Sequence, residues 1–289
     1  MNGWLIVNSF MDSDKFKEIY TLLLEAAKAK GISLKLLKSC EITDIVGSSF
    51  SGYTLPDFAI FWDKDVMLAQ QLENAGLKLF NSADAIYACD NKAQTYISLA
   101  KAGIRIPKTI IAPKTFEGIG YNDFDFLKNA IDRLGLPIII KEAYGSFGQQ
   151  VFLANTLDEA KEIIKKIGHK EFVFQKFIKN SCGKDVRINV VGGKVVASML
   201  RYNDNDFRSN ITNGGNMKPF NPSDAQNQLA VAAAKALNSD FAGVDILFGP
   251  DDAPVVCEVN SNPHFKSTLE CTGVNLAEHI INYIAEELK

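Results

Sequence analysis

The sequence predicts a small open α/β unit at the N-terminus, followed by a larger part of the α+β class. In roughly the first eighty residues, short apolar runs alternate with segments whose apolar residues recur at helical spacing. That order is typical of a parallel sheet with helices packed on its faces. Farther along, runs of alternating apolar and polar residues are joined by hairpin signals and separated by helices. The second part is therefore expected to contain antiparallel sheets.

The N-terminal unit is predicted to contain four strands and two helices. The strands are expected at 4–7, 33–37, 57–62 and 77–80. The helices are expected at about 16–27 and 64–74, and Gly31 and Gly76 follow their ends. No Gly-x-Gly-x-x-Gly follows the first strand, so a dinucleotide site is not predicted in this unit.

The remaining elements follow from the same signals. A helical connection is expected over 81–103, with Asp90 as its cap. Strands are expected at 108–112, 137–141, 151–153, 171–175, 185–191 and 194–201, and in the two apolar runs of 242–263. Helices are expected at about 123–134, 157–167, 223–237 and 276–288. Gly192-Gly193 indicates a hairpin, and the polar stretch 202–216, rich in Gly and Asn, predicts a loop.

The composition argues against several classes of protein. Of the 289 residues, 47% are hydrophobic and the net charge is −3, which is typical of a globular protein and does not predict nucleic-acid binding. The N-terminus lacks the basic region of a signal peptide, and no apolar run reaches the length of a membrane span. The five cysteines are scattered without a Cys-x-x-Cys pair, so a reducing cytoplasm is expected rather than a disulfide scaffold or a zinc site.

Three oxygen-bearing side chains are expected to converge on the hairpin 242–263. Alternation in VVCEVN puts Glu258 and Asn260 on one face of a strand, and the turn GPDDAP can bring Asp245 across to them. Two carboxylates and an amide oxygen are suitable ligands for Mg²⁺ that also holds phosphate. An edge hairpin with solvated acids is the alternative. By the same alternation, Cys257 is expected to face the core.

A small glycine loop follows a lysine at the end of a buried strand. Gly145, Ser146 and Gly148 come directly after PIIIKEAY, which contains Lys141. Such a loop can bring backbone N–H groups against phosphate oxygens, although it is not a Walker A loop. Lys141 and Lys92 carry the charge that a phosphate requires. The alternatives are a glycine-containing hairpin and solvated surface lysines.

Three arginines lie close to these segments in the sequence. Arg187 and Arg201 fall on predicted strands, and Arg208 falls in the predicted loop within DFRSN, which ends at Asn210. The planar guanidinium group binds carboxylate and phosphoryl oxygens well. Unrelated surface arginines are the alternative.

The order of these features resembles the ATP-grasp superfamily, and within it the ribosomal-protein-modifying glutamate ligase (RimK-like) type. The resemblance rests on the lysine and glycine loop followed by FQKFI, DVRINVVGGKVV, DFRSN, AGVDIL and EVNSNP, and it spans roughly Asp90 to the C-terminus. It implies an ATP-grasp fold preceded by a small open α/β (pre-ATP-grasp) domain. The implied division is a pre-ATP-grasp domain at 1–89, an N-terminal subdomain with the glycine loop at 90–170, and a C-terminal subdomain with the metal and substrate site at 171–289.

The resemblance also implies a reaction and a role for each matching residue. A carboxylate attacks the γ-phosphate of ATP, and an amine then displaces phosphate to form an amide or peptide bond. The implied nucleotide-binding residues are Lys92, Lys141, Gly145, Ser146, Gly148, Gln175, Lys176, Phe177, Ile178, Asp185 and Arg187. Asp245, Glu258 and Asn260 would bind Mg²⁺ or Mn²⁺, and Arg201, Arg208 and Asn210 would act on the transferring phosphoryl group.

Departures from the family pattern cluster where substrates would meet the phosphate. Tyr144 replaces an acidic residue, Gln150 replaces the last loop glycine, and Thr212 and Asn213 replace basic residues. The run 262–266 (NPHFK) replaces the usual serine-proline-glycine, and it places His264 near the predicted metal site. The identities of the acid and the amine are therefore not carried over.

Two further hypotheses stay open at this stage. One is an ATP-binding regulatory or partner-docking protein without ligase turnover, and the other is a kinase-like enzyme that stops at phosphorylation. The expected partners are ATP, a carboxylate substrate and an amine acceptor, without a membrane or nucleic acid, and the resemblance allows a homo-oligomer.

Overall fold

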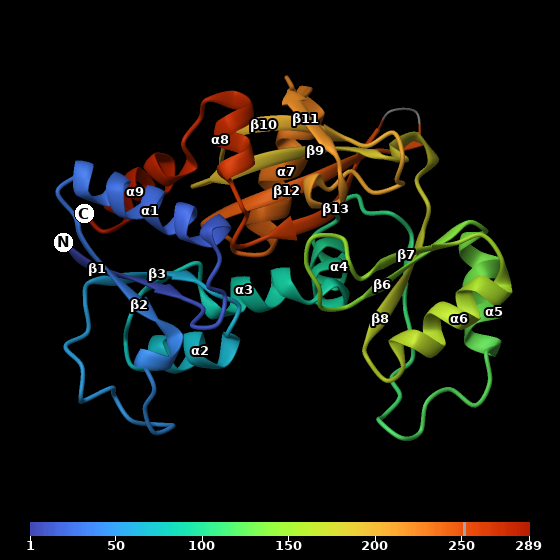
Figure 1. Cartoon of the computed structure of the whole chain (residues 1–289), viewed down its shortest axis with the longest axis horizontal. Helices are drawn as coiled ribbons and strands as arrows, with labels where there is room; N and C mark the ends of the chain where they lie inside the picture. Colours follow the sequence, from blue (N-terminus) through green and yellow to red (C-terminus); the bar gives the residue numbers. More distant parts are fainter. Residues whose placement is uncertain (251–252) are drawn as a thin grey trace.

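The protein is built on three separate sheets, each with its own covering helices (Figure 1). The structure is a computed structural model that describes residues 1–250 and 253–289. Within these residues, no helix combines the length and the apolar character that crossing a membrane requires.

The first sheet is parallel and has the strand order β2-β1-β3-β4. Its strands are β1 (Asn2–Val7), β2 (Ser33–Lys38), β3 (Phe58–Trp62) and β4 (Leu79–Phe80). Their apolar runs are nearly continuous because both faces are covered. Helix α1 (Asp14–Ala29) and the C-terminal helix α9 (Leu276–Glu287) share the core of one face, and α2 (Val66–Asn74) covers the other.

The second sheet is antiparallel and has the order β11-β10-β9-β12-β13. Its strands are β9 (Lys184–Val191), β10 (Lys194–Tyr202), β11 (Asn216–Pro219), β12 (Phe241–Phe248) and β13 (Pro254–Asn260). One face packs on α7 (Asp224–Ala236), α4 (Lys92–Lys101) and the end of α3 (Ala83–Asp90). The opposite face carries charged residues of β9, β10 and β12, because side chains alternate along each strand.

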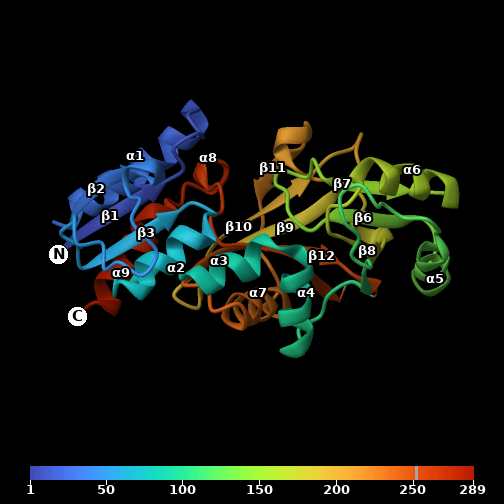
Figure 2. The same ribbon diagram turned by 90° about the horizontal axis from the view of Figure 1, so that it is seen from below.

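The third sheet is antiparallel and has the order β5-β8-β6-β7. It consists of β5 (Thr109–Ile111), β6 (Ile138–Glu142), β7 (Val151–Ala154) and β8 (Phe172–Lys176). Helices α5 (Asp125–Leu134) and α6 (Leu157–Ile167) cover one face with a core of their own. Viewed from below, this sheet lies at the opposite end of the molecule from the first sheet, with the second sheet between them (Figure 2).

One buried asparagine ties the first sheet to the second. Asn81, which follows β4, is fully buried. Its Nδ2 donates to the carbonyl oxygens of Phe241 (3.0 Å) and Ser261 (2.8 Å), and its Oδ1 accepts from the backbone N–H of Asp240 (2.6 Å). These bonds satisfy backbone groups at both ends of the β12–β13 hairpin, so the hairpin is fixed against the N-terminal unit.

Most predicted elements are confirmed, with three differences. The cap of α4 is Asn91 rather than Asp90, because the Asn91 side chain accepts from the Gln94 N–H (3.1 Å) while Asp90 ends α3. Strand β11 begins at the end of the predicted loop 202–216, where no alternating apolar pattern marks it. Helix α8 (Lys266–Thr272) is only two turns long and was not predicted. Asp251 and Asp252, in the predicted turn, lie outside the described residues.

Candidate active site

Two adjoining cavities lie on the charged face of the second sheet. The first, of about 110 Å³, lies between this face and the third sheet. The second, of about 620 Å³, extends toward the first sheet. Ser146, Arg201, Asn210 and Glu258 line both cavities and therefore mark the junction between them.

All the site residues predicted from the sequence line one of these cavities. The first cavity is lined by Lys92, Lys141, Gly145, Ser146, Gly148, Gln175, Lys176, Phe177, Ile178, Asp185, Arg201, Arg208, Asn210, Asp245 and Glu258. Arg187 and Asn260 line the second. The structure thus brings residues of the second and third sheets and of α4 together, whereas the roles assigned to them remain predictions.

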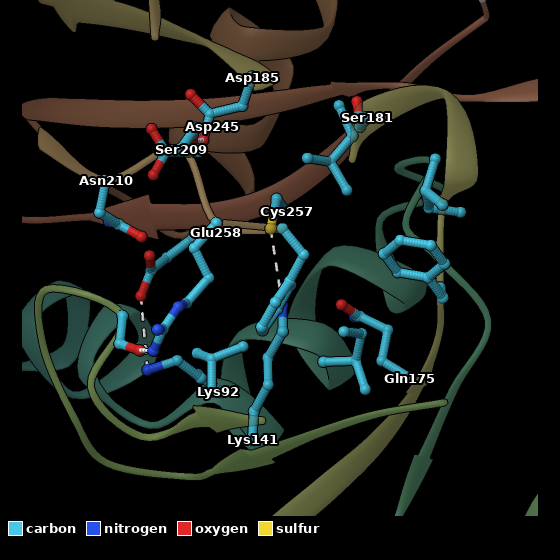
Figure 3. Close-up of a pocket in the computed structure, with 18 of the residues that line it drawn as sticks. Lys92, Lys141, Gln175, Ser181, Asp185, Ser209, Asn210, Asp245, Cys257 and Glu258 are labelled. Carbon is cyan, nitrogen blue, oxygen red and sulfur yellow. Dashed lines mark hydrogen bonds and ion pairs between the residues drawn. The ribbon is translucent and has the colours of Figure 1, made fainter. Parts of the chain in front are cut away.

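Two buried lysines reach across the first cavity toward β13 (Figure 3). The Nζ of Lys92, in the first turn of α4, lies 3.1 Å from the carbonyl oxygen of Gly145 and 3.4 Å from Oε1 of Glu258. The Nζ of Lys141, on β6, lies 3.1 Å from the hydroxyl of Tyr96 and 3.5 Å from Sγ of Cys257. Within the described ranges, Lys141 forms no ion pair, so its charge is available to an anionic ligand.

The pKa of Lys141 is raised despite its burial. Burial alone lowers this pKa, but the negative charge that Cys257, Tyr96 and Glu258 can carry outweighs it. These neighbours therefore favour the charged form of Lys141.

The glycine loop is held closed by the loop that follows β10. Arg208 donates through Nη1 to the carbonyl oxygen of Gly148 (2.8 Å), and Asn213 donates through Nδ2 to that of Phe147 (3.2 Å). Gly148 has φ of +72°, and a Cβ there would lie 2.5 Å from Oδ1 of Asn210, so no larger residue fits this contact. A site for a drug-sized ligand commonly has a volume of about 300–1,000 Å³. The closed cavity is smaller than this, so the two loops would have to part to admit a ligand of that size and could then close over it.

A buried cluster of two arginines and two aspartates forms the floor below the junction. Arg201 donates to Asp185 through Nε (2.7 Å) and Nη2 (2.6 Å), and its Nη2 lies 2.9 Å from Oδ2 of Asp245. Arg187 binds Asp245 through Nε and through Nη2 (2.9 Å). The hydroxyl of Ser209 donates to Asp185 (2.6 Å). Burial alone raises the pKa of Asp245, but Arg187 and Arg201 outweigh it and lower the pKa, so this carboxylate stays ionised.

The predicted metal-binding residues lie opposite one another in the β12–β13 ladder. Asp245 pairs with Glu258, and Gly243 pairs with Asn260. Asn260 donates through Nδ2 to the carbonyl oxygen of Gly243 (3.3 Å), which leaves its Oδ1 as the atom able to bind a cation. Oδ1 of Asn262, on the wall of the second cavity, is buried without a hydrogen-bond partner within the described ranges. This oxygen-rich set fits a hard divalent cation. Among the described residues, no group of three or more His, Cys, Asp or Glu side chains is arranged to hold a metal, so an amide oxygen would have to complete the set.

A β-bulge overturns the expected orientation of Cys257. Asp245 pairs with Glu258 but Ile246 pairs with Val256, so Cys257 is an extra residue in β13. An extra residue interrupts the strict alternation of side chains. Cys257 consequently lines the first cavity instead of facing the core (Figure 3). The sequence contains no glycine or proline at this point that would have indicated the bulge.

The end of β8 and the segment that follows it form one wall of the first cavity. Gln175 is buried at the end of β8, and its Nε2 donates to Oγ1 of Thr109 (2.9 Å). The chain then continues through Lys176, Phe177 and Ile178 along the cavity wall.

The wall of the second cavity includes residues of the N-terminal unit that were not predicted. Asn8 and Asp63 directly follow the adjacent parallel strands β1 and β3, and the Asn8 Nδ2 donates to Asp63 (3.1 Å). The strand order reverses between β1 and β3, and ligands bind at such switch points beside the carboxyl ends of parallel strands. Polar residues at these two strand ends are the signal that could have identified this wall.

Burial lowers the pKa of His264, which lies on the second cavity. Its Nε2 lies 3.1 Å from the carbonyl oxygen of Lys15 in α1. A carbonyl only accepts, so Nε2 carries the proton and Nδ1 is left as an acceptor. His264 thus contacts the N-terminal unit and is a neutral side chain at neutral pH.

The arrangement of the three sheets is that of an ATP-grasp ligase. The RimK domain protein of the ATP-grasp type from Sphaerobacter thermophilus superposes with a TM-score of 0.74, at 20% identity, over 98% of this chain and 99% of that one. The family model of the RimK-like ATP-grasp domain matches residues 89–284. The chain therefore belongs to the RimK-like ATP-grasp family, and the fold and family predicted from the sequence are confirmed.

Three relatives differ in how much of their length this chain covers. An uncharacterised protein of Mycoplasma pneumoniae (MG012 homolog) is 32% identical over 91% of this chain and 92% of its own length. Human N-acetylaspartylglutamate synthase A is 33% identical over 79% of this chain but only 58% of its own length. A probable alpha-L-glutamate ligase of Maridesulfovibrio salexigens is 35% identical over 75% of this chain and 70% of its own length. This chain thus spans little more than half of the human synthase.

Proposed function

We propose that this protein is an ATP- and Mg²⁺-dependent ligase that joins a carboxylate to an amine through an acyl phosphate. The observation that carries the proposal is the junction of the two cavities. A nucleotide in the first cavity would direct its terminal phosphate toward Ser146, Arg201, Asn210 and Glu258. A substrate in the second cavity would reach the same four residues.

The nucleotide is proposed to bind along the length of the first cavity. Adenine would lie against Gln175 and the backbone of 176–178, and Asp185 would face the ribose from the opposite wall. Lys92, Lys141 and the N–H groups of the glycine loop would contact the phosphates. Because Arg187 and Arg201 are balanced by Asp185 and Asp245, and Arg208 is paired with Asp206 (2.7 Å), the buried positive charge without an ion-pair partner among the described residues comes from Lys141.

Asp245, Glu258 and Asn260 are proposed to hold Mg²⁺ or Mn²⁺. Such a cation neutralises charge on the transferring phosphoryl group. Glu258 is the most accessible of the two acids, since its side chain is 29% exposed and that of Asp245 is 4% exposed.

The reaction requires positioning and charge neutralisation rather than a covalent step on the protein. The substrate carboxylate attacks the γ-phosphorus, and the bond to the β-phosphate oxygen breaks to release ADP. The amine nitrogen then attacks the acyl carbon, phosphate leaves, and one N–H proton is lost to solvent or a base. Arg201, Arg208 and Asn210 are proposed to act on the phosphoryl group.

The names of the relatives suggest the first substrates to test. We propose an amino acid as the amine, with L-glutamate tested first, and a small acid, peptide or protein as the carboxylate. We further propose a cytoplasmic enzyme, because ATP is abundant there and all five cysteines are free thiols. A homo-oligomer is part of the same proposal, and sedimentation would measure it.

The proposed function is tested by ADP release across a panel of acids and amines. Wild-type protein is expected to release ADP and phosphate only when an acid is present and to form an amide when the amine is added. Glu258→Gln keeps the size of the side chain but removes its charge, and it should reduce turnover by about a hundredfold or more. Turnover in that variant at the wild-type rate contradicts the proposal, and a stable phosphorylated product without amide would indicate a kinase-like reaction.

A further inference from the structure

Among the described residues, the second cavity contains one cationic side chain without an acidic partner. Four of its five lysine and arginine side chains form ion pairs with carboxylates: Arg187 with Asp245, Arg201 with Asp185, Lys64 with Asp90, and Lys266 with Glu18 and Glu270. The fifth is Lys15. Within residues 1–250 and 253–289, no carboxylate lies within ion-pair distance of its Nζ, and burial lowers its pKa.

The position of Lys15 is fixed from two sides. Its carbonyl oxygen accepts from Nε2 of His264 (3.1 Å), which anchors the first turn of α1 to the segment after β13. Its Nζ lies 4.1 Å from the centre of the Phe147 ring in the glycine loop. A lysine above an aromatic face is held by attraction to the ring without losing its charge. The ammonium group is therefore oriented at the wall of the cavity and has no anion to bind.

We propose that Lys15 binds a carboxylate of the substrate that does not take part in the reaction and so determines the substrate specificity of the ligase. This inference rests on the proposed function. The reacting carboxylate must meet the terminal phosphate at the junction of the cavities. Lys15 lines the second cavity and not the first, so it would bind a second negative group of a substrate held in the second cavity.

The contact between Lys15 and Phe147 links binding of the second carboxylate to the closed position of the glycine loop. Phe147 belongs to the glycine loop, which must move when a nucleotide enters. Lys15 is held beneath this ring only when the loop is closed, so the second carboxylate is bound most tightly in the closed state. Phe147→Leu, which keeps an apolar side chain but removes the ring, should weaken binding of the second carboxylate less than loss of Lys15 does.

The carboxylate can belong to the acid substrate or to the amine acceptor, and calorimetric titrations distinguish the two. Protein loaded with Mg²⁺ and the non-hydrolysable nucleotide AMP-PNP is titrated with succinate, glutarate and adipate and with their monoamides in the acid arm. L-glutamate and its two monoamides are used in the amine arm. The wild type should bind the probe with two carboxylates about tenfold or more tightly than its monoamide in at least one arm, which identifies the source.

The critical variant is Lys15→Gln, with Lys17→Gln as its matched control. Lys17 is on the same helix, and its side chain is 56% exposed and paired with Asp12 (2.7 Å). Lys15→Gln should bind the two-carboxylate probe about tenfold more weakly and lose the discrimination, while Lys17→Gln behaves as wild type. AMP-PNP affinity should be unchanged in both variants, which separates this proposal from the nucleotide site.

Three outcomes overturn the proposal. They are a Lys15→Gln variant that keeps its discrimination, an equal loss in Lys17→Gln, and a wild type that binds none of the two-carboxylate probes. ADP release that depends on Glu258 would leave the proposed function intact in each case. Loss of that dependence would instead contradict the ligase itself.

Discussion

Two regions of the site differ in how they balance charge. In the buried cluster at the junction of the two cavities, Arg187 and Arg201 are matched by Asp185 and Asp245. On the wall of the second cavity, Lys15 has no carboxylate partner within the described residues. The first arrangement is suited to a reaction that is the same for every substrate, because it is complete before a ligand binds. The second is completed only by the ligand, which is what discrimination between substrates requires.

The largest expected effect comes from breaking the balanced cluster. Asp245→Ala leaves the guanidinium of Arg187 buried without a partner and removes one of two partners from Arg201. Loss of one member of a buried ion pair costs about 3–5 kcal/mol in the free energy of unfolding. Urea denaturation at neutral pH measures this loss.

Asp158→Ala is the matched control for that experiment. Asp158 pairs with Lys161 (3.1 Å) on the surface, and its side chain is 89% exposed. An exposed pair contributes about 1 kcal/mol or less. Equal midpoints for the two variants would mean that the cluster does not stabilise the fold.

The two cavities also differ in how far the sequence predicts them. Most of the site residues predicted from the sequence line the first, because they lie in short motifs on strands and in one glycine loop. The N-terminal wall of the second was not predicted, since Asn8, Lys15 and Asp63 lie in a separate unit with no shared motif. Their convergence depends on strand order and on the packing of α1, which are properties of the tertiary structure. The bulge at Cys257 was also not predictable from alternation, because alternation assumes an uninterrupted ladder.

A single substitution can weaken the contact between the glycine loop and the loop that follows β10. Arg208→Gln removes the bond from Nη1 to the carbonyl oxygen of Gly148, so the glycine loop opens more readily. Because Arg208 is also proposed to bind the phosphoryl group, loss of this charged contact should weaken ATP binding by about tenfold. Isothermal titration with AMP-PNP measures the affinity, and limited proteolysis measures opening of the loop.

Arg133→Gln is the matched control for Arg208→Gln. Arg133 is exposed in the last turn of α5, away from both cavities. This variant should match the wild type in affinity and in cleavage. An unchanged cleavage rate in Arg208→Gln would show that the closed loop does not depend on Arg208.

Alkylation can test whether the side chain of Cys257 faces the first cavity. Cys257 lines this cavity, so bound Mg²⁺-ATP should slow its reaction with N-ethylmaleimide by about fivefold at saturating nucleotide. The reaction without nucleotide should itself be slow, because burial raises the pKa of the Cys257 thiol. Peptide mass spectrometry identifies the modified residue in a protein whose exposed Cys40 and Cys182 are replaced by serine.

Cys89 serves as the internal reference in that experiment. It is buried away from both cavities, and burial raises the pKa of its thiol to about 12. Its labelling should not respond to ATP. If labelling of Cys257 is equally insensitive to ATP, its side chain faces the core, as simple alternation along β13 predicts.

The smallest expected effect is on the pH dependence of stability, and it is caused by His264, which lines the second cavity. His264 has a folded-state pKa below its ordinary value of 6.5, because burial and the charges of Lys15 and Lys266 outweigh its bond to the Lys15 carbonyl and the charge of Glu18. Below about pH 6.5 the unfolded chain therefore binds more protons at this position than the folded protein. The neutral imidazole contributes stability that is present above that pH and is lost as the pH falls toward the folded-state value.

His264→Gln removes this dependence and keeps a donor for the Lys15 carbonyl. We expect its free energy of unfolding to fall less steeply than that of the wild type between pH 6.5 and pH 5. Urea denaturation at a series of pH values measures both slopes, and His279→Gln, at an exposed position on α9, should retain the wild-type slope. Parallel curves for His264→Gln and wild type would mean that the imidazole is as easily protonated in the folded protein as in the unfolded chain. The second cavity would then present a titrating cation beside Lys15, and its selection of anions would strengthen in acid.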